Sequence, residues 1–325
     1  MTDFAADAFT GLVAHLDELI AMRPAGGESG FAPARKVRTH QNGGYRSSFH
    51  GRGMEFDEVR AYQPGDDIRT IDWRVTARTG RTHTKLFQEE RERPVLILLD
   101  ARAFMRFGSR VCFKSVAAAR AAALLAWISL DGGDRVGGLV LRPSGLVFHP
   151  PQRSRARVMA LLKAMADATQ DQFDAPSAVG PEPGLAEAIS RLRRAARPGT
   201  LVFLVSDFHD FDPAAARELA RLSLQCQITN VLVFDVLEAA APRGGAYPFS
   251  DGTAVGRVEA ESNRVRAAYA RRFAERHAAL SDLSRQRGMS FVTLATGQDP
   301  ADILHPERVR RAARASAEGP GGAAA

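Results

Sequence analysis

Two aspartates that follow predicted strands are the residues of this chain best placed to do chemistry. Asp100 follows the apolar run 95–99, and Asp207 follows, one serine later, the apolar run 201–205. Ligands of open parallel sheets bind beyond the carboxyl ends of the strands, so both carboxylates can point into one crevice. Two carboxylates in a partly desolvated crevice repel each other and raise each other's pKa. A cation would relieve this repulsion, and it could be either a metal ion or a basic side chain.

A histidine beside the second aspartate suggests one enzymatic reading. Asp100, Asp207 and His209 could together support metal-dependent hydrolysis, and we keep this as an alternative function. A histidine in a loop next to a strand end is more often an ordinary polar residue. The sequence contains no HExxH zinc helix and no GxSxG nucleophile elbow. Cys112 and Cys226 form no CxxC pattern, and we expect both to be small buried residues.

A near match to a phosphate-binding loop precedes a predicted helix. Residues 108–115 resemble GxxxxGK[ST], but Phe113 stands where the second glycine must allow close approach of the backbone to phosphate. We therefore expect no nucleotide binding, and we interpret Lys114 as a residue at the start of a helix.

The elements that must position the two aspartates alternate along the chain from residue 94 onward. Predicted strands cover 95–99, 135–141, 201–205, 228–235 and 290–294, and predicted helices cover 113–130, 154–167, 184–196, 213–224 and 259–286. This alternation predicts an α/β fold with a doubly wound, mostly parallel sheet and helices on both faces.

The remaining segments suggest four parts. Residues 1–44 are an N-terminal helix and a linker, 45–93 a charged strand/turn subdomain, 94–314 the α/β domain, and 315–325 a disordered Gly/Ala/Pro-rich tail.

The charged subdomain carries candidate partner-binding residues. Its charges form either a surface that a partner recognises or an internal ion-pair lattice, because arginine forks pair well with carboxylates. We expect Trp73 to be a buried anchor in both cases. The candidates are Arg60, Asp66, Asp67, Arg69, Asp72, Arg74 and Arg78.

Composition and charge narrow the function classes. The formal net charge is +7, but the arginines are interleaved with Asp and Glu and no nucleic-acid module is recognisable. We therefore expect no nucleic-acid partner, and an arginine-rich nucleic-acid-binding protein remains an alternative. The longest apolar stretch, 116–130, is interrupted by Arg120 and is too short to cross a bilayer. We expect no transmembrane segment and a cytoplasmic protein.

A family resemblance follows from several stretches in order. They are 51–60, 62–69, 71–74, 77–80, 89–91, the strand ending at Asp100, and 206–208. The chain closely resembles the domain of unknown function 58 (DUF58) family, most specifically in YQPGDDIRTIDW, residues 62–73. The resemblance implies a von Willebrand factor A-like (VWA-like) domain and a MoxR-type AAA+ ATPase as partner. It implies a non-enzymatic adaptor or scaffold in a chaperone-like maturation or metal-insertion system, acting on an unknown client protein.

The same resemblance implies a degenerate metal site. VWA-like domains often bind a divalent cation through a DxSxS motif, a threonine and a further aspartate. Here Asp100 and Asp207 match, whereas Arg102 and Phe104 replace the two serines and Pro183-Gly184 stands where the threonine is expected. The loss of three oxygen ligands disfavours Mg²⁺, so we expect no cofactor and no working metal site. Arg102 either folds back between Asp100 and Asp207 as a tethered cation or points to solvent.

Overall fold

The computed structural model describes ten stretches of the chain, which belong to two compact units. The described residues are 11–24, 31, 54–64, 66, 68–89, 92–174, 182–240, 244–250, 255–259 and 262–306. The first unit contains residues 1–35 and 93–325, and the second contains residues 36–92. The N-terminal helix therefore shares a unit with the α/β domain, while the tail expected at 315–325 lies outside the described residues.

The first unit is built on a six-stranded sheet with the strand order β10-β7-β6-β3-β4-β5. Five strands are parallel, and the edge strand β5 runs antiparallel to β4. The strands are β3 (Pro94–Asp100), β4 (Arg135–Arg142), β5 (Gly145–Gln152), β6 (Leu201–Ser206), β7 (Gln227–Phe234) and β10 (Ser290–Ala295). Because β3 and β6 are central neighbours, their carboxyl ends bring Asp100 and Asp207 to the same edge.

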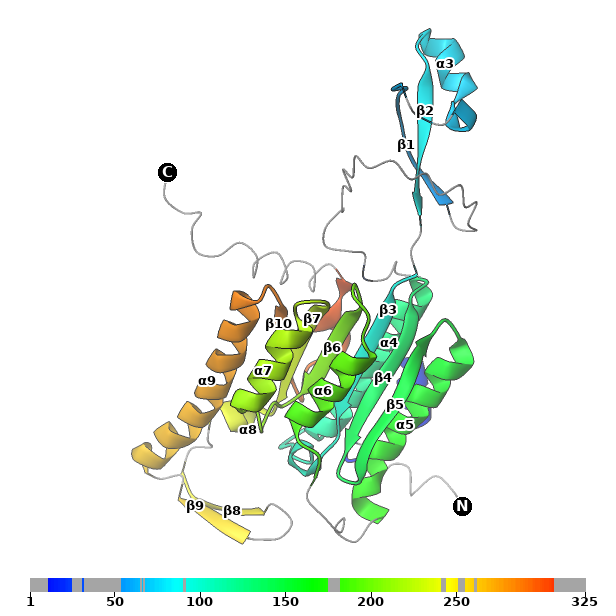
Figure 1. Ribbon diagram of the computed structural model, residues 1–325. Helices are drawn as coiled ribbons and strands as arrows, with labels where there is room; N and C mark the ends of the chain where they lie inside the picture. Colours follow the sequence, from blue (N-terminus) through cyan, green and yellow to red (C-terminus); the bar gives the residue numbers. More distant parts are fainter. Residues whose placement is uncertain are drawn as a thin grey trace, which may run out of the picture. The chain divides into compact units, whose positions relative to one another are not determined.

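Helices cover both faces of this sheet, which confirms the predicted fold class (Figure 1). One face carries α2 (Leu16–Ala21), α4 (Lys114–Asp131), α5 (Arg155–Asp174) and α10 (Pro300–Leu304). The other carries α6 (Leu185–Ala195), α7 (Pro213–Leu222) and α9 (Asn263–Gln286). Successive β3 side chains alternate between the two cores, as the pleat of a strand requires: Ile97 faces α4, and Leu98 faces the α6 side.

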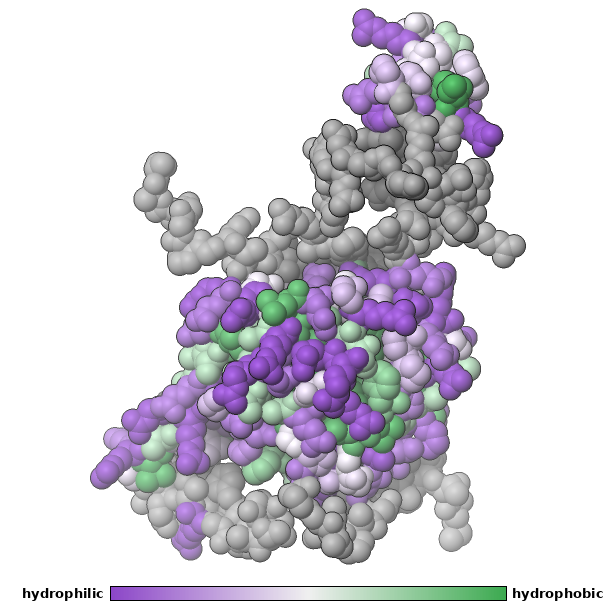
Figure 2. Space-filling view, viewed as in Figure 1, coloured by the Kyte–Doolittle hydropathy of each residue, from purple (hydrophilic) through white to green (hydrophobic). Residues whose placement is uncertain are grey.

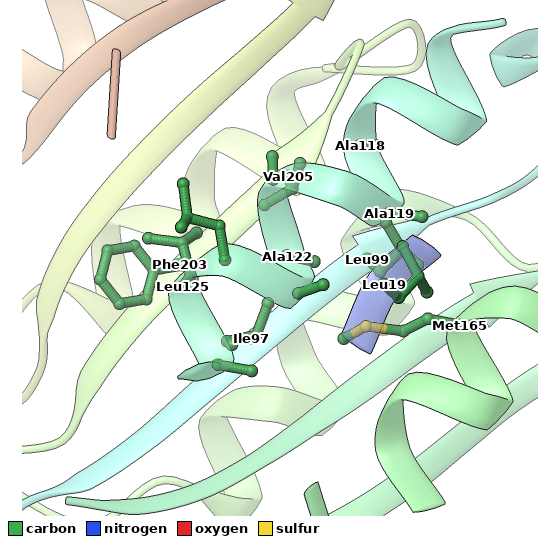
Figure 3. Packing of buried hydrophobic residues seen from close by; sticks show 14 of the residues in the cluster. Leu19, Ile97, Leu99, Ala118, Ala119, Ala122, Leu125, Met165, Phe203 and Val205 are labelled. Carbon is green, nitrogen blue, oxygen red and sulfur yellow. The ribbon is translucent and has the colours of Figure 1, made fainter. Parts of the chain in front are cut away.

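The alanine-rich helix α4 is the centre of the core on the face that α2, α5 and α10 also cover (Figure 3). Its small side chains, including Ala118 and Ala122, let the helix lie close to β3 and β6, while Leu19 of α2 and Met165 of α5 pack beside it. Fifteen of its residues are buried, which is typical of a helix that is covered all round. The Trp127 indole Nε1 donates to Leu19 O at 3.0 Å, so α2 is fixed to this core by a hydrogen bond as well as by packing.

Between β7 and α9 the structure contains elements that were not predicted. A short helix, α8 (Val236–Ala239), is followed by the hairpin of β8 (Ala246–Ser250) and β9 (Val255–Glu259). The hairpin lies at the carboxyl end of the sheet (Figure 1). Both cysteines are free and buried, as predicted. None of the helices in the described ranges is both long and apolar enough to cross a membrane.

The second unit pairs β1 (Met54–Ala61) with β2 (His83–Glu89) in an antiparallel hairpin. Between them lie a 3-10 turn, Ile68–Thr70, and α3 (Trp73–Thr79), a helix that the interpretation as strands and turns missed. Asp72 begins α3 by accepting from Arg74 N and Val75 N, and Gly80 ends it in the left-handed conformation (φ 68°).

The expectation that Trp73 is a buried anchor was wrong. Its relative exposure is 67%. The physical reason is the size of the unit: a short hairpin and a seven-residue helix enclose little volume. Among the residues of this unit whose burial is described, Thr84 is the only buried one.

Candidate functional site

The carboxyl edge of the sheet holds a buried ion-pair network, which begins with Asp100 at the end of β3. Asp100 Oδ1 accepts from Arg102 N (3.1 Å) and Arg102 Nε (3.0 Å). Its Oδ2 accepts from Arg102 Nη2 (2.8 Å) and Ser206 Oγ (2.7 Å). Asp100 is 1% exposed and Arg102 is 7% exposed. Arg102 therefore folds back onto Asp100 and does not point to solvent.

The second partner of the Arg102 guanidinium is Asp210. Arg102 Nη1 and Nη2 donate to the two Asp210 oxygens, each at 2.7 Å, and Nη1 also donates to Pro183 O at 3.2 Å. The expectation that Arg102 lies between Asp100 and Asp207 is thus correct for the first aspartate and wrong for the second. Asp210 Oδ2 also accepts from Leu185 N (2.9 Å), so this carboxylate serves the first turn of α6, where Gly184 provides no side-chain cap.

Asp207 is paired with a different cation. Lys114, the first residue of α4, donates from Nζ to Asp207 Oδ2 at 2.6 Å and to Glu238 Oε1 of α8 at 2.8 Å. The second Asp207 oxygen accepts from His209 N at 3.0 Å. Lys114 and Asp207 are each 1% exposed. Two basic side chains of this chain thus occupy the positions beside the two strand-end carboxylates.

The electrostatics of the network favour the charged forms. Burial alone would raise the pKa of Asp207, but the Lys114 ammonium, helped by Arg276 and by the His209 N–H, leaves that pKa below its ordinary value. The same balance holds for Asp210, where burial is opposed mainly by the hydrogen bond from Arg102, so its pKa is also lowered. Burial alone would lower the pKa of Arg102, yet Asp210 and Asp100 raise it well above its ordinary value. The Asp207 and Asp210 carboxylates and the Arg102 guanidinium therefore stay ionised around neutral pH.

A further aspartate anchors the loops around this network. Asp235, which follows β7, accepts from Ser109 N (2.9 Å), Ser109 Oγ (2.7 Å) and Thr296 Oγ1 (2.7 Å). These bonds fix the loop before α4 and the loop after β10 to the start of α8. Phe208 adopts a positive φ of 51° in the loop after β6, a strained conformation that a densely bonded edge can hold.

An aromatic stack lies above the buried charges. The Phe104 ring is stacked on the His209 ring, with centroids 3.7 Å apart and an interplanar angle of 18°. Phe104 is 50% exposed, and Val236 at the start of α8 is 52% exposed. Burial lowers the pKa of His209, so its ring is neutral at pH 7. At this point of the edge an apolar side chain and a neutral ring therefore lie together at the surface.

The residues at this edge do not fit a divalent cation. Both Asp100 oxygens and both Asp207 oxygens already accept hydrogen bonds, and the Arg102 guanidinium provides no oxygen ligand. Within the described ranges no three His, Cys, Asp or Glu side chains gather as metal ligands do. Because Arg102 and Lys114 occupy the two carboxylates, the set Asp100, Asp207 and His209 lacks the open position that metal-assisted hydrolysis needs.

The structure divides the charged candidates of the second unit into two groups. Arg60 pairs with Asp66 at 2.7 Å, and Asp72 caps α3, so these charges are engaged within the unit. Arg74 and Arg78 point outward from α3 and form no ion pair within the described part of the chain, and Arg69 is also exposed. Asp67 lies outside the described residues.

Comparison with known proteins gives a family match and uncharacterised relatives. A model of the family "Protein of unknown function DUF58" matches residues 58–279. An uncharacterised protein of Mycobacterium bovis and another of Mycobacterium tuberculosis are each 31% identical to this chain over 264 residues, covering 80% of this chain and 81% of the relative.

Two solved structures are also similar. One is a conserved hypothetical protein, BatB, from Bacteroides thetaiotaomicron, at 14% identity and a TM-score of 0.41, covering 69% of this chain and 98% of BatB. The other is the SpRpn10 VWA domain, at 11% identity and a TM-score of 0.36, covering 67% of this chain and 97% of that domain.

Proposed function

The chain belongs to the DUF58 family and has a VWA-like fold, and we propose that it is a non-enzymatic adaptor that binds a MoxR-type AAA+ ATPase. In this proposal it links the ATPase to a client protein in a chaperone-like maturation or metal-insertion system. The family is of unknown function, so the role is argued from the site and from the resemblance in residues 62–73.

The observation that carries the proposal is the pairing of both strand-end aspartates with fixed cations. A hydrolase at this edge would need an open metal position and an activated water. Instead, Arg102 and Lys114 supply the positive charge that the carboxylates require. Such a network rigidifies the loops without providing a reactive group, which suits a surface for binding.

The shape of the same edge also supports a binding role. Phe104, in the segment between β3 and α4, and Val236, at the start of α8, are half-exposed, and Asp235 holds both segments through its bonds to Ser109 N and Leu237 N. Exposed apolar side chains on rigid loops are typical of protein contacts, since little conformational entropy is lost on binding. We assign this edge to the client protein.

The experiment is co-purification of the tagged full-length chain from its native cell at native expression level. We expect a MoxR-type AAA+ ATPase in the eluate and none when the untagged parent strain is processed in parallel. Repeated recovery of the tagged chain without such an ATPase would contradict the proposal. A Mg²⁺- or Mn²⁺-dependent hydrolysis that is lost in Asp207→Ala would favour the metal-dependent hydrolase instead.

A further inference from the structure

The second unit exposes two large apolar side chains that its own small interior does not cover. Trp73 and Ile68 are each 67% exposed. Ile68 begins the 3-10 turn that precedes α3, and Trp73 is the first residue of α3. Exposed tryptophans are uncommon on free surfaces and are enriched at the centres of protein interfaces.

Beside the tryptophan the same helix presents positive charge that has no ion-pair partner among the described residues. In α3 the exposed positions are Trp73, Arg74, Ala77, Arg78 and the last residue, Thr79, and the helical spacing i, i+1, i+4 and i+5 places the first four on one face. The less exposed residues Val75 and Thr76 face the other way, and Thr76 Oγ1 accepts from His83 N of β2 at 3.0 Å. The aromatic ring and the two guanidinium groups therefore share one outward face.

The two nearest acidic residues in the described part of the chain, Asp72 and Asp66, do not neutralise these arginines. Asp72 accepts from the backbone N–H groups of Arg74 and Val75, and Asp66 is paired with Arg60. Both carboxylates thus serve the fold of the unit. Strongly hydrophilic residues lie beside a few hydrophobic ones on the surface of this unit, as Figure 2 shows. The face is consequently both apolar and positively charged.

We infer that Ile68, Trp73, Arg74 and Arg78, here called the α3 surface, bind an acidic protein surface that offers an apolar recess for the indole. The sign of the unpaired charge selects an acidic partner, and the apolar side chains favour a protein over a nucleic-acid backbone. This inference rests on the proposed function in one respect: it assigns the α3 surface to the AAA+ ATPase, which leaves the carboxyl edge of the sheet for the client.

The test labels the full chain with 5-fluorotryptophan and follows its two tryptophans by fluorine NMR. Trp73 is exposed and Trp127 is fully buried, so the second resonance is an internal control. Three probes are added separately: a purified MoxR-type AAA+ ATPase, a synthetic Asp/Glu-rich peptide that contains leucines, and a DNA duplex. We expect the ATPase and the acidic peptide to shift the Trp73 resonance and to leave that of Trp127 unchanged.

Two variants change the α3 surface, and two control variants change exposed residues elsewhere. Trp73→Ala and Arg74→Glu/Arg78→Glu should each weaken binding at least about tenfold, the loss expected for residues at the centre of an interface, without lowering the melting temperature. Arg271→Glu/Arg272→Glu makes the same charge change on exposed residues of α9, and Leu224→Ala removes another exposed apolar side chain. We expect both controls to bind as the wild type does.

The outcomes separate this inference from the proposed function. Binding of the acidic peptide without any binding of the ATPase would retain the α3 surface and contradict the ATPase as partner. Binding of the ATPase with unchanged affinity for Trp73→Ala and Arg74→Glu/Arg78→Glu would overturn the α3 surface and retain the proposed function. A Trp73 resonance that responds to neither protein probe, or that responds most strongly to DNA, would also overturn it.

Discussion

Replacing Arg102 with alanine should lower the free energy of unfolding by about 3–5 kcal/mol, the range expected when one partner of a buried ion pair is removed. The variant leaves the Asp100 carboxylate, which is 1% exposed, without the donors on Nε and Nη2. It also removes both guanidinium bonds to Asp210, which serves the first turn of α6. Denaturant unfolding of the full chain measures the change.

Two further variants separate the loss of a charge pair from a simple packing defect. Arg102→Ala/Asp100→Asn should recover part of the lost stability, since the unpaired buried charge is gone. Arg221→Ala removes an exposed arginine that pairs with Glu218 at 2.7 Å, and its effect should stay below about 1 kcal/mol. If Arg102→Ala is as stable as Arg221→Ala, the pairing of the Arg102 guanidinium with Asp100 and Asp210 does not stabilise the protein in solution.

Replacing Lys114 with methionine should also destabilise the protein by about 3–5 kcal/mol. Methionine keeps most of the side-chain volume but leaves Asp207 buried without its ammonium partner and removes the bond to Glu238 of α8. The expected defect therefore reaches two loops, the one after β6 and the one after β7. Thermal and denaturant unfolding of the full chain provide the readout.

Removing the charge of Asp207 as well should restore part of the stability that Lys114→Met loses. Lys114→Met/Asp207→Asn should regain stability relative to Lys114→Met, because the remaining side chain can be buried without a charge. Lys163→Met is the matched control, since Lys163 is 64% exposed in its pair with Asp167, and we expect a change below about 1 kcal/mol. A double variant less stable than Lys114→Met would show that Asp207 finds its stabilisation elsewhere.

The sheet and its order of elements could be predicted from the sequence because its two central strands, β3 and β6, are continuous apolar runs. Residues 95–99 and 201–205 have no alternation, which is typical of strands covered on both faces. The hairpin at 246–259 could not be predicted in this way. Its strands are only five residues each and lie outside the main sheet, so no long apolar run marks them.

The candidate site could be predicted in part. Asp100, Arg102 and Asp207 were placed correctly at one edge, because strand ends are readable from hydrophobicity. The ion-pair partners of Asp207 and Arg102 could not be predicted, because they depend on how loops far apart in sequence are arranged. Lys114 lies 93 residues before Asp207, and Asp210 lies 108 residues after Arg102. Lys114 was recognised only as the start of a helix, which is correct and incomplete.

The exposure of Trp73 could not be predicted from its residue type. A large aromatic residue is buried when its unit has a core to receive it, and sequence alone did not reveal that the second unit has so few buried residues. Because the Trp73 ring is exposed, the charged residues around it divide into two groups. Arg74 and Arg78 become surface groups, while Arg60, Asp66 and Asp72 remain structural.

Calorimetric titration with Mg²⁺ tests most directly the central claim that Arg102 and Lys114 take the place of a divalent cation at the carboxyl edge. We expect the wild-type protein to give no specific binding heat, and Arg102→Ser/Phe104→Ser, which restores two hydroxyl ligands beside Asp100, to bind Mg²⁺ measurably. Specific binding of Mg²⁺ by the wild-type protein, lost on Asp207→Ala, would contradict the claim and would identify the edge as a working metal site.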